Sequence, residues 1–132
     1  MMKILITGAG GMVGQALVTK LVNQGIQVVA CDYPGKASCF DSLIDSGLIN
    51  IVELDITNCC WDYILDDVTH VIHLAAKVHV HKKEGQKWDD FYKTNVLGTK
   101  TLCEALANKN IEKFIFISTV GVHGDYPKID EK

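Results

Sequence analysis

Apolar runs and segments of helical periodicity alternate along the chain. The run Lys3–Thr7 is almost continuous, as expected for a strand buried on both faces of a parallel sheet. Glycines follow it at once, and from Met12 to Gln24 apolar residues recur at helical spacing until Gly25 provides a stop signal. The pattern therefore predicts a strand, a glycine turn and a helix at this end of the chain.

The rest of the chain repeats this alternation. A short helix or irregular crossover is expected at Ser38–Gly47, and a long helix at Trp88–Asn108. Further apolar runs predict strands at Ile26–Cys31, Ile49–Leu54, Val68–Ala76 and Phe114–Ser118. Because parallel strands need crossover connections, which are right-handed, the pattern predicts an α/β fold with a doubly wound parallel sheet of order 3-2-1-4-5.

Length and composition favour a single domain over residues 1–132. Hydrophobic residues make up 48% of the chain, which is enough for one core of ordinary size. The net charge of −3 and the scattered lysines provide no basic stripe, so nucleic acid is not an expected partner. The apolar runs are too short for a membrane helix and no secretion signal precedes the first strand, so a cytoplasmic location is expected.

Cysteines and histidines form no pattern typical of a disulfide framework or a metal centre. None of the five cysteines is spaced C-x-x-C, so we expect reduced thiols, although the neighbours Cys59 and Cys60 leave a redox role open. His79 and His81 form an H-x-H pair. Lysines follow them directly, which favours a solvated loop, and no metal is expected.

A glycine-rich turn joins the first predicted strand to the first helix. Gly8, Gly11 and Gly14 give the spacing G-x-x-G-x-x-G. Gly8 permits a tight turn, Gly11 lets the backbone approach a diphosphate, and Gly14 lets the helix pack closely on the strand. The start of the helix, at Met12 and Val13, presents free N–H groups to an anion. This context indicates a dinucleotide-binding site.

Asp32 ends the second predicted strand, about 20 residues beyond the turn, where such folds place an acid on the adenosine ribose. A carboxylate there accepts hydrogen bonds from the ribose hydroxyls and repels a 2′-phosphate. The chain contains no arginine, and Lys36 is the only cation close in sequence, so NAD is favoured over NADP. The alternative is that Asp32 simply begins a turn with Tyr33, Pro34 and Gly35.

The glycine spacing resembles that of short-chain dehydrogenase/reductases, and four further stretches resemble their extended branch, the NAD-dependent epimerase/dehydratase family, especially the nucleotide-sugar 4-epimerases. They are Asp55-Ile56, His73-Leu74-Ala75-Ala76, Asn95-Val96-Leu97-Gly98-Thr99 and the segment from Phe114 to Gly124. Together with the turn they span the whole chain. The resemblance implies a Rossmann-type fold that is truncated here.

The resemblance also implies roles for individual residues around the cofactor. Asp55 and Ile56 contact the adenine, although a helix cap before Thr57 and Asn58 is an equal alternative. In the segment Leu74, Ala75 and Ala76, which the resemblance places at the cofactor, the small side chains of the two alanines let the backbone approach NAD, unless they only serve close packing. Asn95 is expected beside the cofactor, since an asparagine and a glycine within a helix need a local reason.

On the fifth strand, the resemblance assigns the hydroxyl that bonds the substrate's reacting oxygen to Thr119, with Ser118 as the substitute if the register slips by one. The alternative is a strand end capped by ordinary hydroxyls. His123 stands where the relatives have a tyrosine, which puts the substrate contacts in question.

The family's proton chemistry depends on a tyrosine and a lysine four residues later, and the chain has no such pair. The residues four beyond its tyrosines are Ala37, Asp67, Val96 and Asp130. We therefore expect an N-terminal fragment, inactive by itself, of an enzyme that transfers hydride transiently from a nucleotide-sugar to NAD. A homodimer through the helix Trp88–Asn108 is also implied.

Other functions remain open at this stage. A non-catalytic dinucleotide-binding sensor module would need no tyrosine. Within the enzymes, a hydroxysteroid dehydrogenase or a sugar dehydratase is compatible with the same motifs, because the substrate-binding half of such proteins lies outside these residues.

Overall fold

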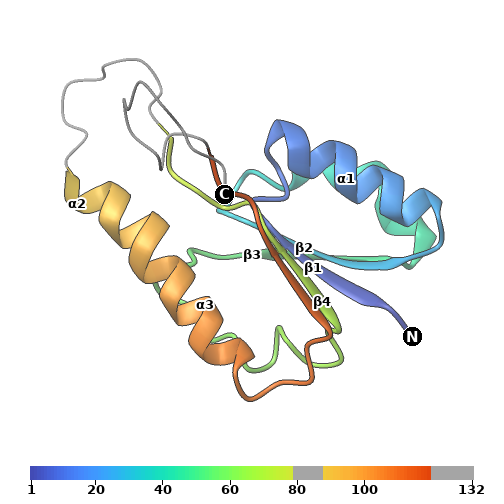
Figure 1. Ribbon diagram of the computed structural model, residues 1–132. Coiled ribbons are helices and arrows are strands. Elements are labelled where there is room, and N and C mark those ends of the chain that lie inside the picture. The colour runs from blue at the N-terminus through green and yellow to red at the C-terminus, as the bar shows by residue number, and fades with distance from the viewer. Residues whose placement is uncertain (79–87, 120–132) are drawn as a thin grey trace, which may run out of the picture.

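The computed structural model describes residues 1–78 and 88–119, and within them five parallel strands form one sheet. The strand order is β3-β2-β1-β4-β5, which confirms the predicted topology and fold class. The strands are β1 (Lys3–Thr7), β2 (Gln27–Asp32), β3 (Ile49–Glu53), β4 (His70–His73) and β5 (Lys113–Phe116). The chain crosses from one half of the sheet to the other between β3 and β4, so β1 and β4 flank the switch point (Figure 1).

Helices cover both faces of the sheet (Figure 1). Helix α1 (Met12–Asn23) and the 3₁₀ helix η1 (Ser38–Ser46) lie on one side. A continuous helical rod lies on the other and consists of α2 (Trp88–Phe91), the π-helical stretch η2 (Tyr92–Gly98) and α3 (Thr99–Leu106). Within residues 1–78 and 88–119, every helix is too short or too polar to span a lipid bilayer.

The core has two halves, one on each face of the sheet. Ile4 and Ile6 of β1 pack with α1 and η1, whereas Leu5 between them packs against the opposite face with Leu102 of α3. Successive strand residues point to opposite faces, so a strand covered on both sides must be apolar throughout. This explains why the first strand reads as an almost unbroken apolar run.

The rod and the strands around it differ in detail from the sequence-based expectation. The predicted helix Trp88–Asn108 is interrupted by the π-helical stretch and ends at Leu106. The predicted strand Val68–Ala76 is regular only at His70–His73. The Leu74 N–H still bonds the Thr7 carbonyl at 3.2 Å, and further on the backbone of Lys77 is held by a side chain of the rod. No helix fills the crossover from β3 to β4; turns bury Trp61 and Leu65 there instead.

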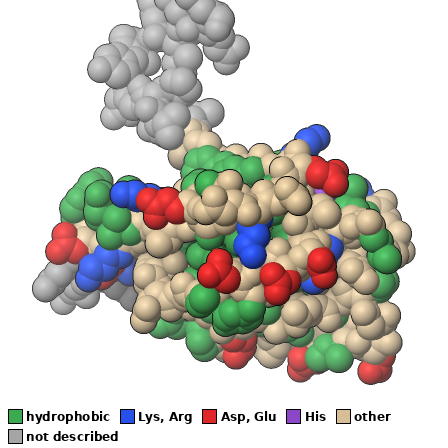
Figure 2. All heavy atoms as spheres, turned by 90° about the horizontal axis from the view of Figure 1, so that it is seen from below, with side chains coloured by type: hydrophobic (Ala, Val, Ile, Leu, Met, Phe, Trp, Pro, Cys, Tyr) green, Lys and Arg blue, Asp and Glu red, His purple; other side chains and the backbone are tan. Residues whose placement is uncertain are grey.

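Acidic and basic side chains are interspersed on the face seen in Figure 2, among apolar and uncharged groups. Mixed signs of this kind create no strong field over that face.

Of the cysteines, Cys31 is buried and Cys59 is partly buried, whereas the other three are exposed. All five are free thiols. Burial raises the pKa of Cys31 to about 12 and that of Cys59 to about 11. Both therefore remain protonated at neutral pH, the form that is a poor nucleophile.

Candidate functional site

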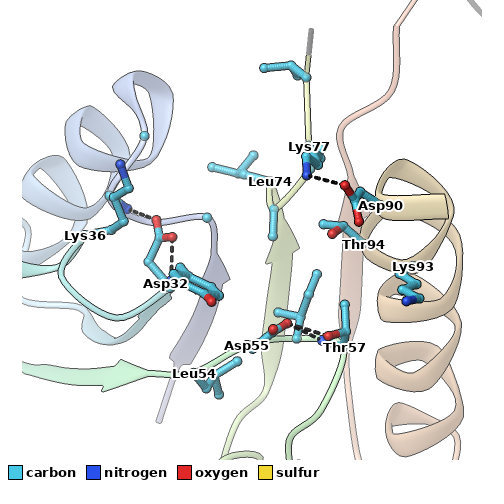
Figure 3. Close-up of a pocket in the computed structure, with 18 residues that line it drawn as sticks. Asp32, Lys36, Leu54, Asp55, Thr57, Leu74, Lys77, Asp90, Lys93 and Thr94 are labelled. Atoms are coloured by element: carbon cyan, nitrogen blue, oxygen red, sulfur yellow. Dashed lines mark hydrogen bonds and ion pairs between the residues drawn. The ribbon is translucent and has the colours of Figure 1, made fainter. Parts of the chain in front are cut away.

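A groove of ≈ 940 Å³ runs along the carboxyl edge of the sheet, over the switch point between β1 and β4. Its size is that of a typical small-molecule site, and crevices of open parallel sheets lie at this edge. Eight of the residues predicted for the site line it: Gly8, Gly11, Asp32, Asp55, Ile56, Leu74, Ala75 and Ala76. Figure 3 shows the lining side chains converging from β2 and β3 on one side and from α2 and η2 on the other.

Close backbone packing requires glycine at the turn after β1. Gly8 has a φ of 68°, and a Cβ there would lie 2.7 Å from the Ala75 nitrogen. A Cβ on Gly14 would lie 2.5 Å from the carbonyl oxygens of both Gly8 and Ala9. The turn, the first helical turn and the segment after β4 therefore approach one another at distances that side chains would prevent.

The start of α1 is suited to an anion. Gly11 occupies the N-cap position, without a side-chain cap, and the first turn contains no acid. The first N–H groups of a helix lack intrahelical partners and carry the positive end of its dipole. Met12 and Val13 begin the helix with exposed side chains and lie outside the groove-lining set.

Asp32 lines the groove at the end of β2 and is held by the backbone. Its Oδ2 accepts the Gly10 N–H at 2.7 Å, and its Oδ1 accepts the Tyr33 N–H at 2.6 Å. A turn is also present, but it begins one residue later than the alternative had it, because the Lys36 N–H bonds the Tyr33 carbonyl at 3.0 Å. A turn follows Asp32 and the acid faces the groove, so the two interpretations are compatible (Figure 3).

Asp55 caps the turn that follows β3. Its Oδ1 accepts the Thr57 N–H at 2.9 Å and the Thr57 hydroxyl at 2.7 Å. Both bonds use one oxygen, and the residue lines the groove as well, so capping and ligand contact are compatible here too. The adjacent Ile56 is buried and lies against η2, where a Cβ on Gly98 would come within 2.9 Å of its side chain.

Asn95 does not line the groove, but it binds the backbone of Lys77, which does. Its Oδ1 accepts the Lys77 N–H at 2.7 Å, and its Nδ2 donates to the Lys77 carbonyl at 2.9 Å. The Lys77 ammonium lies 3.6 Å from Asp90 Oδ2 and 5.7 Å from the centre of the Phe91 ring. Asparagine and glycine in this stretch thus have the local reason that the sequence suggested: Asn95 binds a backbone segment, and Gly98 makes room for Ile56.

A buried polar chain connects β1, β4 and α3 beneath the groove. The Thr7 hydroxyl lies 2.6 Å from His73 Nδ1 and accepts the Ala75 N–H at 3.2 Å. His73 Nε2 lies 2.8 Å from the Thr99 hydroxyl. Burial lowers the pKa of His73 below its usual value, so the imidazole is neutral at pH 7.

Ser118 and Thr119 follow β5 and are exposed, outside the groove-lining set. His79, His81 and His123 lie outside the described residues. Among the residues that are described, no group of three or more His, Cys, Asp or Glu side chains is placed to hold a metal ion.

The structure adds groove residues that the motifs did not identify. They are Gly10, Tyr33, Lys36, Leu54, Thr57, Lys77, Val78, Asp90, Lys93 and Thr94. Three of them, Asp90, Lys93 and Thr94, have the i, i+3, i+4 spacing of one helix face, a signal that was present in the sequence. Most of the others lie next to predicted residues in the chain, although Lys36 and Val78 do not, and only the fold shows which of them turn inwards.

This sheet order, with a glycine turn after β1 and an acid at the end of β2, defines a Rossmann-type domain. Residues 4–132 match the model of the NAD dependent epimerase/dehydratase family. The chain belongs to this family of NAD-dependent enzymes, which confirms the resemblance.

Individual relatives agree with the family assignment. A dTDP-glucose 4,6-dehydratase of Streptomyces niveus is 31% identical over 96% of this chain and 40% of its own length. A UDP-glucose 4-epimerase of Halalkalibacterium halodurans is 33% identical over 94% of this chain and 36% of its own. This chain therefore spans about two fifths of the length of these relatives.

A solved structure with the same architecture contains the cofactor. The UDP-glucuronic acid 4-epimerase of Bacillus cereus, in complex with UDP-glucuronic acid and NAD, superposes with a TM-score of 0.84. It is 32% identical, and the match covers 99% of this chain and 44% of that one.

Proposed function

We propose that this chain is the NAD-binding part of an enzyme that acts on a nucleotide-sugar, as an epimerase or dehydratase, by transient hydride transfer to NAD. The observation that carries the proposal is the groove at the β1–β4 switch point, which combines an uncapped helix start, a glycine turn without room for side chains, and a carboxylate at the tip of β2. NAD supplies a hydride acceptor when it is bound.

Each part of the groove suits one part of the cofactor. The amides of Met12 and Val13 bind the diphosphate, because they point from the positive end of α1, and Gly11 lets the backbone come close to it. Asp32 accepts hydrogen bonds from the adenosine ribose. Asp55 and Ile56 contact the adenine. The remaining half of the dinucleotide lies along Leu74, Ala75 and Ala76, whose small or backbone surfaces form the floor.

The hydroxyls after β5 serve the substrate. The register of β4 and β5 pairs His73 with Phe116. Continued for two or three residues, it would bring Ser118 and Thr119 level with Ala75 and Ala76. In our proposal, Thr119, or Ser118 in its place, donates a hydrogen bond to the reacting oxygen of the sugar. The chain alone binds NAD without turning substrate over, because it carries no tyrosine followed by a lysine at the fourth position.

The exposed side chains of the helical rod suggest one further element. We propose a homodimer through the helical rod, supported by Trp88, Tyr92 and Val96, which are 76%, 44% and 46% exposed and recur every fourth residue.

Calorimetric titration of this chain with NAD tests the cofactor site. We expect saturable binding that weakens at least about tenfold in Asp32→Ala, the size of effect that follows from losing a hydrogen bond to a charged group. Asp45→Ala is the matched control, since Asp45 is an exposed carboxylate outside the groove. Absence of saturation at millimolar NAD, or equal weakening in both variants, would contradict the proposal.

A further inference from the structure

Ile56 lies between the groove and the hydrophobic core. Only 8% of its surface is exposed, yet it belongs to the groove lining. It is also a member of the core cluster that contains Trp61, Ile64 and Leu102, each of which is at most 5% exposed. Because a packed core yields little to a displaced side chain, the groove is the direction in which Ile56 can move.

Gly98, in the π-helical stretch η2, provides the space that the Ile56 side chain occupies. A Cβ on Gly98 would lie 2.9 Å from both Cδ1 and Cγ1 of Ile56, closer than the separation at which carbon atoms attract one another. The backbone does not call for glycine, since its φ of −61° and ψ of −44° are ordinary helical values. Glycine is less favourable than alanine inside a helix, so the space for Ile56 is the physical reason for glycine at this position.

One wall of the groove is formed by residues on either side of this contact. Asp55, Ile56 and Thr57 come from the turn after β3, and Lys93 and Thr94 come from η2. Gly98 is buried and lies outside the groove lining, so it acts on the wall only through its neighbour. The position of the Ile56 side chain therefore sets how much room this wall leaves for a flat ring.

We propose that Gly98 is a positioning residue for the cofactor: it lets the Ile56 side chain withdraw against the rod and so leaves room for the adenine ring. The inference rests on the proposed function, which places the adenine at Asp55 and Ile56. A methyl group at position 98 pushes the outer carbons of Ile56 towards the groove, because the core cluster behind them is filled. NAD then binds more weakly, although no groove-lining residue has been replaced.

A double-mutant cycle tests the inference, with calorimetric titration of wild type, Gly98→Ala, Ile56→Val and the double variant. We expect Gly98→Ala to raise the Kd for NAD about tenfold beside isoleucine but less than about threefold beside valine, which lacks the crowded Cδ1. AMP, which contains the adenine but no nicotinamide, should show the same pattern. An unchanged Kd for NAD, an equal rise in both backgrounds, or weaker NAD binding without weaker AMP binding overturns the inference.

Leu97→Ala is the matched control. Leu97 belongs to the same π-helical stretch, is 42% exposed and lies outside the groove lining. The substitution introduces alanine one residue away from Gly98 and should leave the Kd for NAD within about twofold of the wild type. Weakening equal to that in Gly98→Ala would assign the effect to η2 as a whole and overturn the inference.

NMR of the Ile56 δ-methyl group needs no ligand. A soluble gadolinium chelate should relax this methyl group faster in Gly98→Ala than in the wild type, while the fully buried Ile6 methyl group serves as the unchanged reference. In the wild type, a nuclear Overhauser effect should join the Gly98 Hα protons to the Ile56 δ-methyl group. Its absence overturns the inference even if Gly98→Ala does not fold, whereas failure of the wild type to bind NAD overturns the proposed function alone.

Discussion

His73 is a nearly fully buried polar residue, with only 1% of its surface exposed. Both of its ring nitrogens lie within hydrogen-bond distance of threonine hydroxyls, and its ring stacks on Phe116 with centroids 5.7 Å apart. Because both nitrogens are hydrogen-bonded, burial of the neutral imidazole costs little free energy, whereas the protonated form would carry an unpaired charge in the core.

This burial predicts a pH dependence of stability. The pKa of His73 is lower in the folded protein than the usual value of 6.5, so the unfolded chain takes up the proton first. The free energy of unfolding should therefore fall as the pH drops below 6.5, by up to about 1.4 kcal/mol per pH unit, until the folded pKa is reached. Urea unfolding of wild type and His73→Gln at pH 7.5, 6.5 and 5.5 measures it. Equal slopes in the two proteins would contradict the prediction.

At the scale of residues, the sequence could identify the site residues whose role depends on their place next to a strand end. Gly8 and Asp32 stand at fixed places relative to the first two strands, and both line the groove. The sequence could not predict that Gly98 packs against the turn after β3, because the two meet only in the fold. The sequence also could not predict the hydrogen-bond partner of Asn95, since Lys77 meets it only after the strand and the rod have packed.

Among the elements, the rod α2–η2–α3 departs most from the periodicity of its sequence. Apolar spacing predicted one α-helix over Trp88–Asn108, yet residues Tyr92–Gly98 are π-helical. The widened stretch carries both Asn95, which binds Lys77, and Gly98, which admits Ile56. Periodicity reports which face is buried but not a local widening, because tertiary contacts favour it against the intrinsic preference of the chain.

Asn95→Asp tests the contribution of this contact to the fold. The carboxylate can still accept the Lys77 N–H, but its second oxygen then faces the Lys77 carbonyl without a proton to donate. We expect the free energy of unfolding in urea at pH 7.5 to fall by about 1–3 kcal/mol.

The exposed Asn108 provides the matched control, and Asn108→Asp should stay within about 0.5 kcal/mol of the wild type. If Asn95→Asp is no less stable than this control, the amide does not hold the segment after β4.

For the whole molecule, the sheet order followed from the alternation of apolar runs, because few topologies satisfy right-handed crossovers. The same pattern did not predict which apolar surfaces the folded chain leaves exposed. The rod presents Trp88, Tyr92 and Val96 to solvent, and strand β5 at the sheet edge is exposed throughout. Surfaces of this kind mark places where another chain or segment packs.

The proposed homodimer gives this surface a measurable consequence. Sedimentation velocity should find a concentration-dependent dimer in the wild type, and Trp88→Glu should shift it to monomer, because a buried carboxylate is costly at an apolar interface. Tyr63→Glu is the control, since Tyr63 is 67% exposed and lies in the crossover between β3 and β4. A monomer at all concentrations, or dissociation by both substitutions, would exclude the rod as the interface.

The side-chain amide of Asn95 takes the place that one residue of a neighbouring strand would have. It offers an acceptor and a donor to Lys77 just beyond the point where β4 ends, as a neighbouring backbone would. A helix can thus prolong a hydrogen-bonding ladder that the sheet itself has stopped providing. The groove-lining segment after β4 is therefore held in place by a helix and not by another strand. A shift of that helix would also move the segment on which the dinucleotide is proposed to rest.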